Sequence, residues 1–456
     1  MKFLGIDVPV KNIPELDKGF VPLGSFFTAY QKGAVKPVCI AVERSGGQIA
    51  TWETKIYATP EMKDADAYYI DRLVKFLLWS KGGFKVSICG DETVADSIKA
   101  AYSMGGSREF DKTFMERVYE TDFVVESLSY ENAPKPYQTS EAIGRHMDGC
   151  RIGFDAGGSD RKVSAVIDGE AVYSEEVVWF PKTNPDPDYH YNGIVEAFKT
   201  AASKMPRVDG IGISSAGVYV DNKCMVASLF LKVSEADFAA KVKNIYTRAA
   251  KEIGADIPVV VANDGDVTAL AGAMGLDDNA VLGIAMGTSE AVGYVDAEGN
   301  ITGWLNELAF APVDAQPDAM QDEWSGDIGC GVKYFSQDGV IKLAPRAGIT
   351  LTGESPAEKL KEVQKLMEAD DERAVKVYES IGVYLGHSLA LYADFYKINH
   401  VLMLGRVMSG KGGDIIMETA TKVLREEYPA IAFCPEAPDE KTRRVGQSVA
   451  AASLPV

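Results

Sequence analysis

The sequence contains few of the residues that build disulfides and zinc sites. Its 456 residues include six cysteines and four histidines, and no two cysteines form a C-x-C or C-x-x-C pair. This spacing argues against a disulfide framework and against a cysteine-based zinc knuckle. We therefore expect buried free thiols, and structural or surface roles for the histidines.

The chain also lacks a long apolar run and an excess of positive charge. No stretch approaches the ~18 apolar residues of a membrane span, and Asp7 interrupts the first apolar segment, so we expect a cytoplasmic protein without signal peptide or membrane contact. The 47 basic and 66 acidic residues give a formal charge of −19. Such a surface repels nucleic acid, and an ATP site would need local compensation.

The length predicts about three domains at roughly 150 residues each, and strands alternating with helices predict an α/β fold. After an irregular lead-in over residues 1–35, a hairpin (37–58), a helix and a strand are expected. The same order returns about 114 residues later, ending in a helix at 189–205 and a strand at 208–217. This similarity indicates either a degenerate internal duplication or a chance likeness between two ordinary βα units.

Farther along the chain, the pattern predicts helices over 234–253 and 266–275, a strand over 257–262 and a helical region over 356–396. A strand and a helix are expected to follow. The resulting domain prediction has an extension at 1–149, a first lobe at 150–270 with a carboxyl-terminal helix at 440–456, and a second lobe at 271–439.

Two glycine-containing hairpin turns could bind phosphate. In the first, Gly157 and Gly158 allow a sharp turn and close approach of peptide N–H groups to an anion, while Ser159 adds a hydroxyl. Asp155, at the strand end before them, could hold Mg²⁺ directly or through water. Such a sequence is also compatible with an ordinary hairpin turn.

The second turn contains Gly287 and Thr288 and offers the same kinds of donor. Two such hairpins, one in each half, would suit the β- and γ-phosphates of a nucleotide. A further glycine-rich turn at Gly405 could pass against adenine and direct a helix N-terminus at phosphate, although packing alone also favours glycine in such turns.

Asn263 and Asp264 follow a predicted buried strand and precede a helix, where α/β proteins bind ligands. Asp264 could take a proton from a substrate hydroxyl that attacks a phosphoryl group, with Asn263 orienting the same substrate. Helix capping by Asn263, Asp264 or Asp266 is the alternative. We expect Asp266 to be the cap, which leaves Asp264 available.

In order and spacing, these segments resemble the ROK family of the actin, hexokinase and Hsp70 superfamily, which contains bacterial sugar kinases and sugar-responsive repressors. The resemblance covers about residues 150–456. It implies a two-lobed, ribonuclease H-like fold whose cleft binds sugar and ATP, with Asp264 as the base. It places Asn263, Gly217 and Glu307 at the sugar.

The same resemblance places the two hairpin turns at the phosphates. Asp155, Gly157, Gly158 and Ser159 would lie near Mg²⁺ and phosphate. Gly287 and Thr288 would also contact the phosphates, and Gly405 would lie near adenosine.

Several positions depart from the family pattern. Phe310 stands where the family has a sugar-binding histidine, and only Cys330 remains of its zinc-binding cysteine cluster, so we expect no zinc site. Val332, Ser228 and Arg406 replace a glutamate, an asparagine and a glycine. Because these changes remove hydrogen-bonding groups from the expected sugar pocket, glucokinase specificity cannot simply be transferred.

Three functional hypotheses follow. The first is an ATP- and Mg²⁺-dependent kinase acting on a hexose-like sugar, as an expected homodimer. The second is a catalytically inactive sugar- or nucleotide-sensing protein on the same scaffold. The third, a DNA-binding repressor, is disfavoured by the negative charge and by the lack of a basic helix-turn-helix. Trp304 could stack on a sugar or serve as a core or interface residue.

Overall fold

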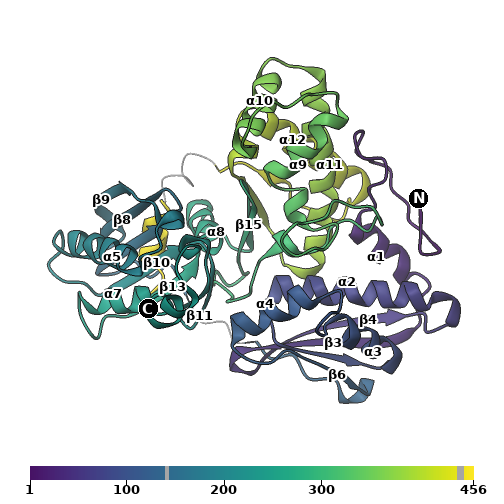
Figure 1. The fold of residues 1–456 in the computed structure, drawn as a ribbon, viewed down its shortest axis with the longest axis horizontal. Coiled ribbons are helices and arrows are strands. Elements are labelled where there is room, and N and C mark those ends of the chain that lie inside the picture. The colour runs from purple at the N-terminus through teal and green to yellow at the C-terminus, as the bar shows by residue number, and fades with distance from the viewer. Residues whose placement is uncertain (139–142, 439–445) are drawn as a thin grey trace. The chain divides into compact units, whose positions relative to one another are not determined.

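The computed structural model describes residues 1–138, 143–438 and 446–456 and shows an α/β chain divided into two units (Figure 1). Unit 1 comprises Met1–Thr139, Ile284–Val292 and Trp304–Ala437, and unit 2 comprises Ser140–Gly283, Gly293–Gly303 and Pro438–Val456. The amino-terminal segment therefore shares a unit with most of the chain after residue 304. No helix within the described ranges is long and apolar enough to cross a membrane.

Unit 2 is built on a five-stranded sheet in the order β13-β10-β7-β8-β9. The first three strands of that order run parallel to one another, and β8 and β9 complete an antiparallel meander with β7. Their bounds are Cys150–Ala156 (β7), Asp160–Ile167 (β8), Glu170–Val178 (β9), Gly210–Ser215 (β10) and Val259–Asn263 (β13). A small hairpin, β11 (Val218–Val220) with β12 (Lys223–Val226), follows β10.

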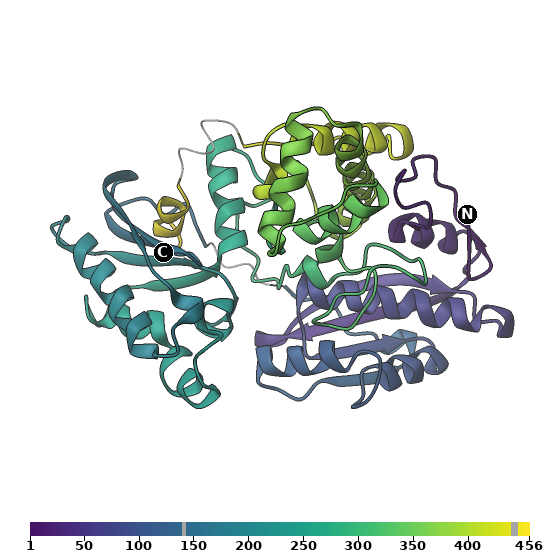
Figure 2. The ribbon, with the colours of Figure 1, turned by 45° about the horizontal axis from the view of Figure 1, so that its top comes forward.

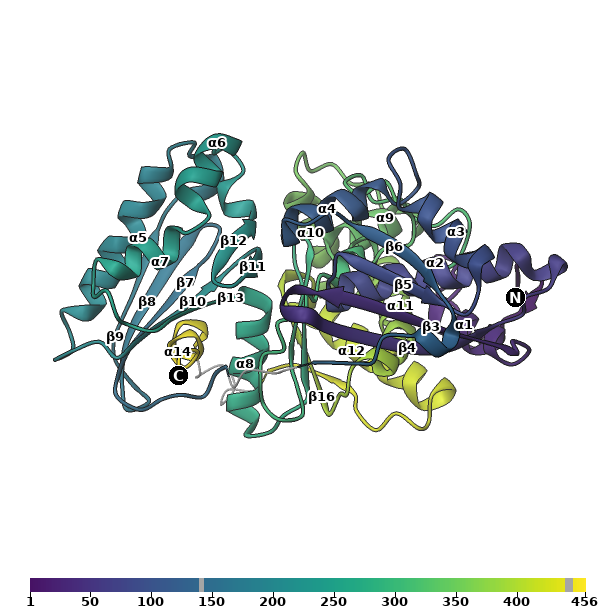
Figure 3. The same ribbon diagram turned by 90° about the horizontal axis from the view of Figure 1, so that it is seen from below.

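Helices cover both faces of this sheet (Figure 3). Helices α5 (Pro187–Ala202) and α7 (Ile245–Lys251) pack together on one face, and α14 (Gln447–Ala452) lies on the other, in contact with α8 (Asp264–Leu276). A β-carbon on Gly153 or Gly212 would lie within 1.7 Å of a carbonyl oxygen of α14, so only glycine allows this close approach. Residues 440–445 of the predicted carboxyl-terminal helix lie outside the described residues.

The predicted helix over 234–253 is interrupted. The structure has a short α6 (Glu235–Asp237), a π-turn (Phe238–Val242) and then α7. The carbonyl oxygen of Lys243 accepts a hydrogen bond from the backbone N–H of Cys224, 2.9 Å away, on strand β12. A neighbouring strand thus takes an acceptor that a continuous helix would use.

The amino-terminal part of unit 1 is a four-stranded sheet in the order β4-β3-β5-β6, with α2 along it (Figure 2). Its strands are β3 (Lys36–Arg44), β4 (Gln48–Ile56), β5 (Lys85–Cys89) and β6 (Val124–Leu128). Its helices are α2 (Lys63–Lys81), α3 (Glu92–Ala101) and α4 (Glu109–Tyr119). The predicted irregular lead-in was wrong in part, because it contains α1 (Leu23–Gln31), whose apolar side chains pack on α11.

This sheet differs from the sheet of unit 2 in the direction of one strand. The amino-terminal sheet begins with a hairpin, a helix and a strand, as expected. In unit 2 the expected hairpin was wrong, because three antiparallel strands, β7, β8 and β9, precede α5 and β10. However, β5 runs antiparallel to β3, whereas β10 runs parallel to β7. The similarity of the two sequences therefore does not extend to the sheet topology that an internal duplication would give.

The remainder of unit 1 is mainly helical. Its helices are α9 (Gln337–Arg346), α10 (Pro356–Glu368), α11 (Glu372–Phe395) and α12 (Lys411–Glu427), of which α11 and α12 pack side by side. They accompany a sheet in the order β15-β14-β16-β17, formed by Glu290–Val295, Val281–Met286, His400–Leu404 and Pro435–Glu436 respectively. Strands β14 and β15 each have residues in both units, because the boundaries at 283/284 and 292/293 fall within them.

Candidate functional site

Asp155 lies near the end of β7, just before the turn at Gly157–Ser159 that leads into β8. Its side chain is buried, and Oδ1 accepts a 3.1 Å hydrogen bond from the hydroxyl of Ser214, the residue paired with it on β10. Burial and the negative charge of Asp264 raise the pKa of Asp155 to about 6, although the Ser214 bond opposes this shift. The carboxyl group is therefore poised to exchange its proton near neutral pH.

Asn263 ends β13 and caps α8. Its Oδ1 accepts a 2.7 Å hydrogen bond from the Gly265 N–H, and its Nδ2 donates a 2.7 Å bond to the carbonyl oxygen of Gly217. The prediction that Asp266 caps this helix was wrong, because the helix begins earlier, at Asp264. Asp266 is instead buried in the first turn of the helix, and its Oδ1 accepts a hydrogen bond from the Tyr294 N–H.

Asp264 is the first helical residue of α8 and is half-buried. Its Oδ1 accepts a 3.0 Å hydrogen bond from the Gly265 N–H. Burial raises its pKa above the ordinary value, while this bond and the positive charge of Lys182 oppose the shift. Asp264 thus lies in the first turn of the helix and does not cap it, and its role as a base stays a prediction.

Gly217 lies next to this pair through its carbonyl bond with Asn263. Its φ is +136°, and a β-carbon there would lie 2.4 Å from the carbonyl oxygen of Val226. Only glycine fits this backbone without strain. The structure thus brings together three residues that the sequence placed at the substrate, Gly217, Asn263 and Asp264, and Asp155 lies close enough to sense the charge of Asp264.

Gln447, on α14, is a residue that the sequence analysis missed. Its Nε2 donates hydrogen bonds to the Ser214 hydroxyl, at 2.9 Å, and to the carbonyl oxygen of Asp264, at 3.0 Å. It therefore joins the partner of Asp155 to the backbone of Asp264. A single glutamine almost 200 residues away carries no local signal that could have revealed this role.

In unit 1, Gly287, Thr288 and Ser289 form the turn between β14 and β15. The Gly287 N–H donates a 2.9 Å hydrogen bond to the Ser289 carbonyl oxygen, so this donor is engaged within the turn. The Gly287 carbonyl oxygen accepts a 2.9 Å bond from the N–H of Gln337, at the start of α9. A β-carbon on Gly287 would contact nothing closer than the Ser289 carbonyl oxygen, at 3.7 Å, so packing does not require a glycine at this position.

Gly405 lies against the same turn. Its φ is +94°, and a β-carbon there would lie 2.3 Å from the carbonyl oxygen of Met286, the residue before Gly287. The glycine is thus required by packing as well as by backbone conformation. Arg406, which follows it, is exposed, and its carbonyl oxygen accepts a bond from Gln364.

Glu290 follows the turn and was not predicted as a site residue. It is 3% exposed, and neither carboxyl oxygen has a hydrogen-bond partner among the described residues. Burial, together with the charge of Glu307, raises its pKa to about 8. The group is therefore largely protonated at neutral pH.

The amino-terminal segment positions Glu307. The backbone N–H of Glu307 donates a 2.9 Å hydrogen bond to the carbonyl oxygen of Trp79, and the N–H of Asn306 donates a 3.0 Å bond to the carbonyl oxygen of Ser80, both at the end of α2. Lys81, in the last turn of that helix, lies 3.1 Å from the ring centre of Trp304. One face of this tryptophan is thus covered by the Lys81 side chain, which favours the packing role over sugar stacking there.

Phe310 and Cys330 lie in packed surroundings. Phe310 is buried in an aromatic cluster with Trp79, its ring centre 4.5 Å away, and with Phe110 and Phe114. Burial raises the pKa of the Cys330 thiol to about 12, which makes the thiolate needed for zinc binding unfavourable. The absence of zinc stays an expectation.

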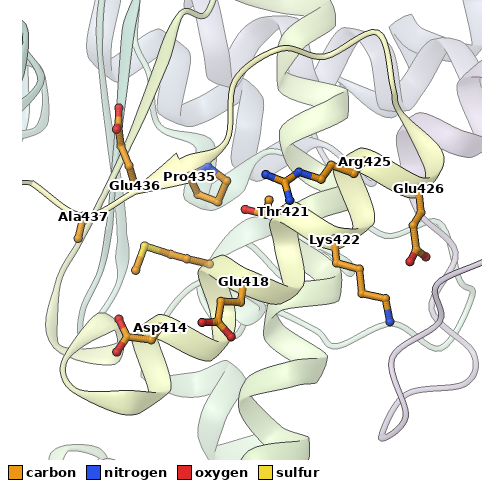
Figure 4. Close-up of a pocket in the computed structure, with 10 residues that line it drawn as sticks. Asp414, Glu418, Thr421, Lys422, Arg425, Glu426, Pro435, Glu436 and Ala437 are labelled. Carbon is orange, nitrogen blue, oxygen red and sulfur yellow. The ribbon is translucent and has the colours of Figure 1, made fainter.

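A groove elsewhere on unit 1 runs between α12 and the chain at 435–437 (Figure 4). Side chains of both signs line it, including Glu418, Lys422, Arg425 and Glu436. None of the predicted site residues belongs to this groove.

The family model of ROK matches residues 151–441, nearly two thirds of the chain. The chain belongs to the ROK family. The predicted α/β fold of the actin-like type is thereby confirmed. A search of curated proteins finds no match.

Solved ROK structures resemble this chain in fold at low identity. A hexokinase from Thermus thermophilus shares 16% identity, with a TM-score of 0.52, covering 67% of this chain and 97% of the hexokinase. A ROK transcriptional regulator, a homologue of the E. coli MLC protein, shares 17% identity, with a TM-score of 0.53, covering 68% and 79%. A Streptomyces griseus glucokinase, solved with glucose and AMPPNP, shares 20% identity, with a TM-score of 0.49, covering 67% and 99%. The ROK fold therefore accompanies both enzymes and regulators.

Proposed function

We propose that this ROK protein is an ATP-dependent carbohydrate kinase that phosphorylates a hydroxyl of a hexose-like sugar. The observation that carries the proposal is the arrangement at the start of α8. There, Asp264 has a carboxyl group of raised pKa. Its chain neighbour Asn263 donates a hydrogen bond to the carbonyl oxygen of Gly217. A carboxylate next to amide and backbone groups suits binding and deprotonating a sugar hydroxyl.

In the proposed reaction, Asp264 accepts the proton of the sugar hydroxyl as that oxygen forms a bond to the γ-phosphorus of ATP. The bond between this phosphorus and the β,γ-bridging oxygen breaks, and ADP leaves with the bonding electron pair. In unit 2, Asn263 is proposed to orient the sugar and the turn at Gly157–Ser159 to bind phosphate oxygens. In unit 1, the family resemblance assigns Glu307 to the sugar, Gly287 and Thr288 to phosphate and Gly405 to adenosine.

The residues present fit a magnesium ion that is bound mainly by ATP. No group of three or more histidine, cysteine or acidic side chains within the described residues could hold a metal alone. Asp155 provides one carboxylate, whose oxygen atoms are the kind of ligand that Mg²⁺ prefers. In phosphate-transferring enzymes, Mg²⁺ is commonly bound by one or two carboxylates together with substrate phosphates and water. The ion, when bound, would neutralise charge on the phosphates.

The experiment is a coupled assay of ADP release with hexoses, amino sugars and polyols. We expect wild-type protein to turn over at least one acceptor. Asp264→Ala should lower kcat by about 100-fold or more, the contribution of a general base, while sugar binding measured by calorimetry changes little. Asp256→Ala, at an exposed aspartate of the same unit, is the matched control.

A second candidate function is a sugar- or nucleotide-sensing protein without catalysis. The packing of Phe310 into an aromatic cluster favours it, because this position offers no hydrogen bond to a sugar. Binding of a sugar or ATP, seen as a thermal shift, without turnover of any acceptor in the panel would establish this function instead. We expect a homodimer in either case, and sedimentation of the full chain tests it.

A further inference from the structure

The loop after β9 lies directly against the first phosphate turn of unit 2. It contains Lys182, in the single helical turn Pro181–Thr183. A β-carbon placed on Gly158 would lie 2.8 Å from Cε and 3.0 Å from Nζ of Lys182. The ammonium group therefore lies over the turn whose peptide groups are proposed to bind phosphate.

Other residues hold this loop in place. The indole N–H of Trp179 donates a 2.7 Å hydrogen bond to the Gly157 carbonyl oxygen, and its backbone N–H donates a 3.1 Å bond to the Ser159 carbonyl oxygen. On the other side, Nε2 of the fully buried His190 lies 3.0 Å from the Pro181 carbonyl oxygen. The loop is thus fixed to the turn without any use of the Lys182 side chain.

The ammonium group of Lys182 is not paired with any described residue. The side chain is exposed and forms no hydrogen bond or ion pair with any residue in the described ranges. The nearby cation Lys162, in contrast, lies 3.6 Å from Asp160 and 3.8 Å from Glu176. Lys182 also acts on Asp264, whose pKa it lowers against the larger effect of burial.

We propose that Lys182 binds substrate, with its ammonium group donating to an oxygen of the terminal phosphate of ATP. This proposal rests on the proposed kinase function. A ligand group that accepts a hydrogen bond from the Lys182 ammonium group must be an anion near both the Gly157–Ser159 turn and the base Asp264. The transferred phosphoryl group of ATP meets both conditions. Since Asp155, Asp160 and Asp264 all repel such an anion, an uncommitted cation beside them supplies the compensation that the acidic chain requires.

The test measures binding of Mg²⁺–AMPPNP and of AMP to the full chain by calorimetry. Lys182→Met should weaken AMPPNP binding about 10- to 100-fold, the usual effect of losing a hydrogen bond to a charged group. AMP binding should stay unchanged, because AMP lacks the terminal phosphates. Lys182→Arg should restore most of the affinity, and Lys251→Met, at an exposed lysine on α7, is the matched control.

The outcomes separate this proposal from the kinase function. Equal AMPPNP affinity of Lys182→Met and Lys251→Met, with wild-type binding intact, overturns the role of Lys182 and leaves the kinase proposal standing. Equal loss of AMPPNP and AMP binding in Lys182→Met also overturns it, because a general disturbance of unit 2 would then be the cause. If the wild-type protein phosphorylates no sugar, the kinase proposal is wrong. If the wild-type protein does not bind AMPPNP, both the kinase proposal and the role of Lys182 are wrong.

Discussion

The ammonium group of Lys75, on α2 of the amino-terminal segment, lies 3.2 Å from the carboxylate of Asp327. Both side chains are almost completely buried, and Arg72 and Arg108 also pair with Asp327, each at 2.8 Å. Two further carboxylates complete the cluster, since Asp111 pairs with Lys75 and Asp71 with Arg108. The extension before residue 140 is thereby joined to the ROK-family part of unit 1.

Asp327→Asn is expected to destabilise unit 1. Burial alone would raise the pKa of Asp327, but the charges of Lys75, Arg72 and Arg108 hold it well below its usual range, so the carboxylate stays ionised in the fold. Neutralising it leaves three buried cations with two carboxylates. Breaking such a buried pair commonly costs about 3–5 kcal/mol of unfolding free energy.

Urea unfolding at pH 7, followed by fluorescence and circular dichroism, measures this change. Asp318→Asn, at an exposed aspartate in the same segment, is the control. Because the folded pKa of Asp327 is depressed, its contribution should be present above the unfolded pKa near 4 and be lost only as the pH falls through the lower folded value. Equal unfolding midpoints for the two variants would contradict the prediction.

Glu290→Gln is expected to stabilise the protein at neutral and alkaline pH. The folded pKa of Glu290 is raised to about 8, so its contribution to stability is fully present below the unfolded pKa near 4.3 and is lost as the pH rises through 8. An amide cannot ionise and avoids this loss. We expect a gain of about 1–3 kcal/mol at pH 8 and little gain at pH 4.5.

The measurement is the difference in unfolding free energy between variant and wild type at the two pH values. Glu379→Gln, at an exposed glutamate on α11, provides the comparison. If the Glu290→Gln difference were the same at both pH values, the group would not be protonated in the fold as described.

Magnesium activation is expected to depend on the protonation of Asp155. Its pKa is raised to about 6, chiefly by burial and also by Asp264, so protons compete with the metal below that pH. The Mg²⁺ concentration for half-maximal kinase activity should rise as the pH falls from 7.5 to 5.5. Asp155→Asn should need more Mg²⁺ at every pH and lose this dependence, whereas Asp256→Asn should behave as wild type. A wild-type requirement that is constant over this range would remove Asp155 from the magnesium site.

The sequence alone located most of the local features of the candidate site. Glycines at 157, 158, 217, 287 and 405 and the Asn263–Asp264 pair could be found because turns and strand ends impose short-range rules on residue type. The α/β class followed from alternating hydrophobic patterns in the same way. The capping residue was assigned wrongly. Asn263 and Asp266 are only three positions apart, and the hydrophobic pattern does not locate the first residue of α8 that accurately.

Only the tertiary structure decided which distant groups meet. Lys182 lies over Gly158 because Trp179 holds its loop, Gln447 reaches Ser214 because two glycines admit α14 to the sheet, and the extension joins unit 1 through Lys75 and Asp327. Burial also decided which carboxyl groups have raised pKa values, as at Asp155 and Glu290. Ion pairing and desolvation depend on distance and solvent exposure, and neither is encoded in the spacing of residues along the chain.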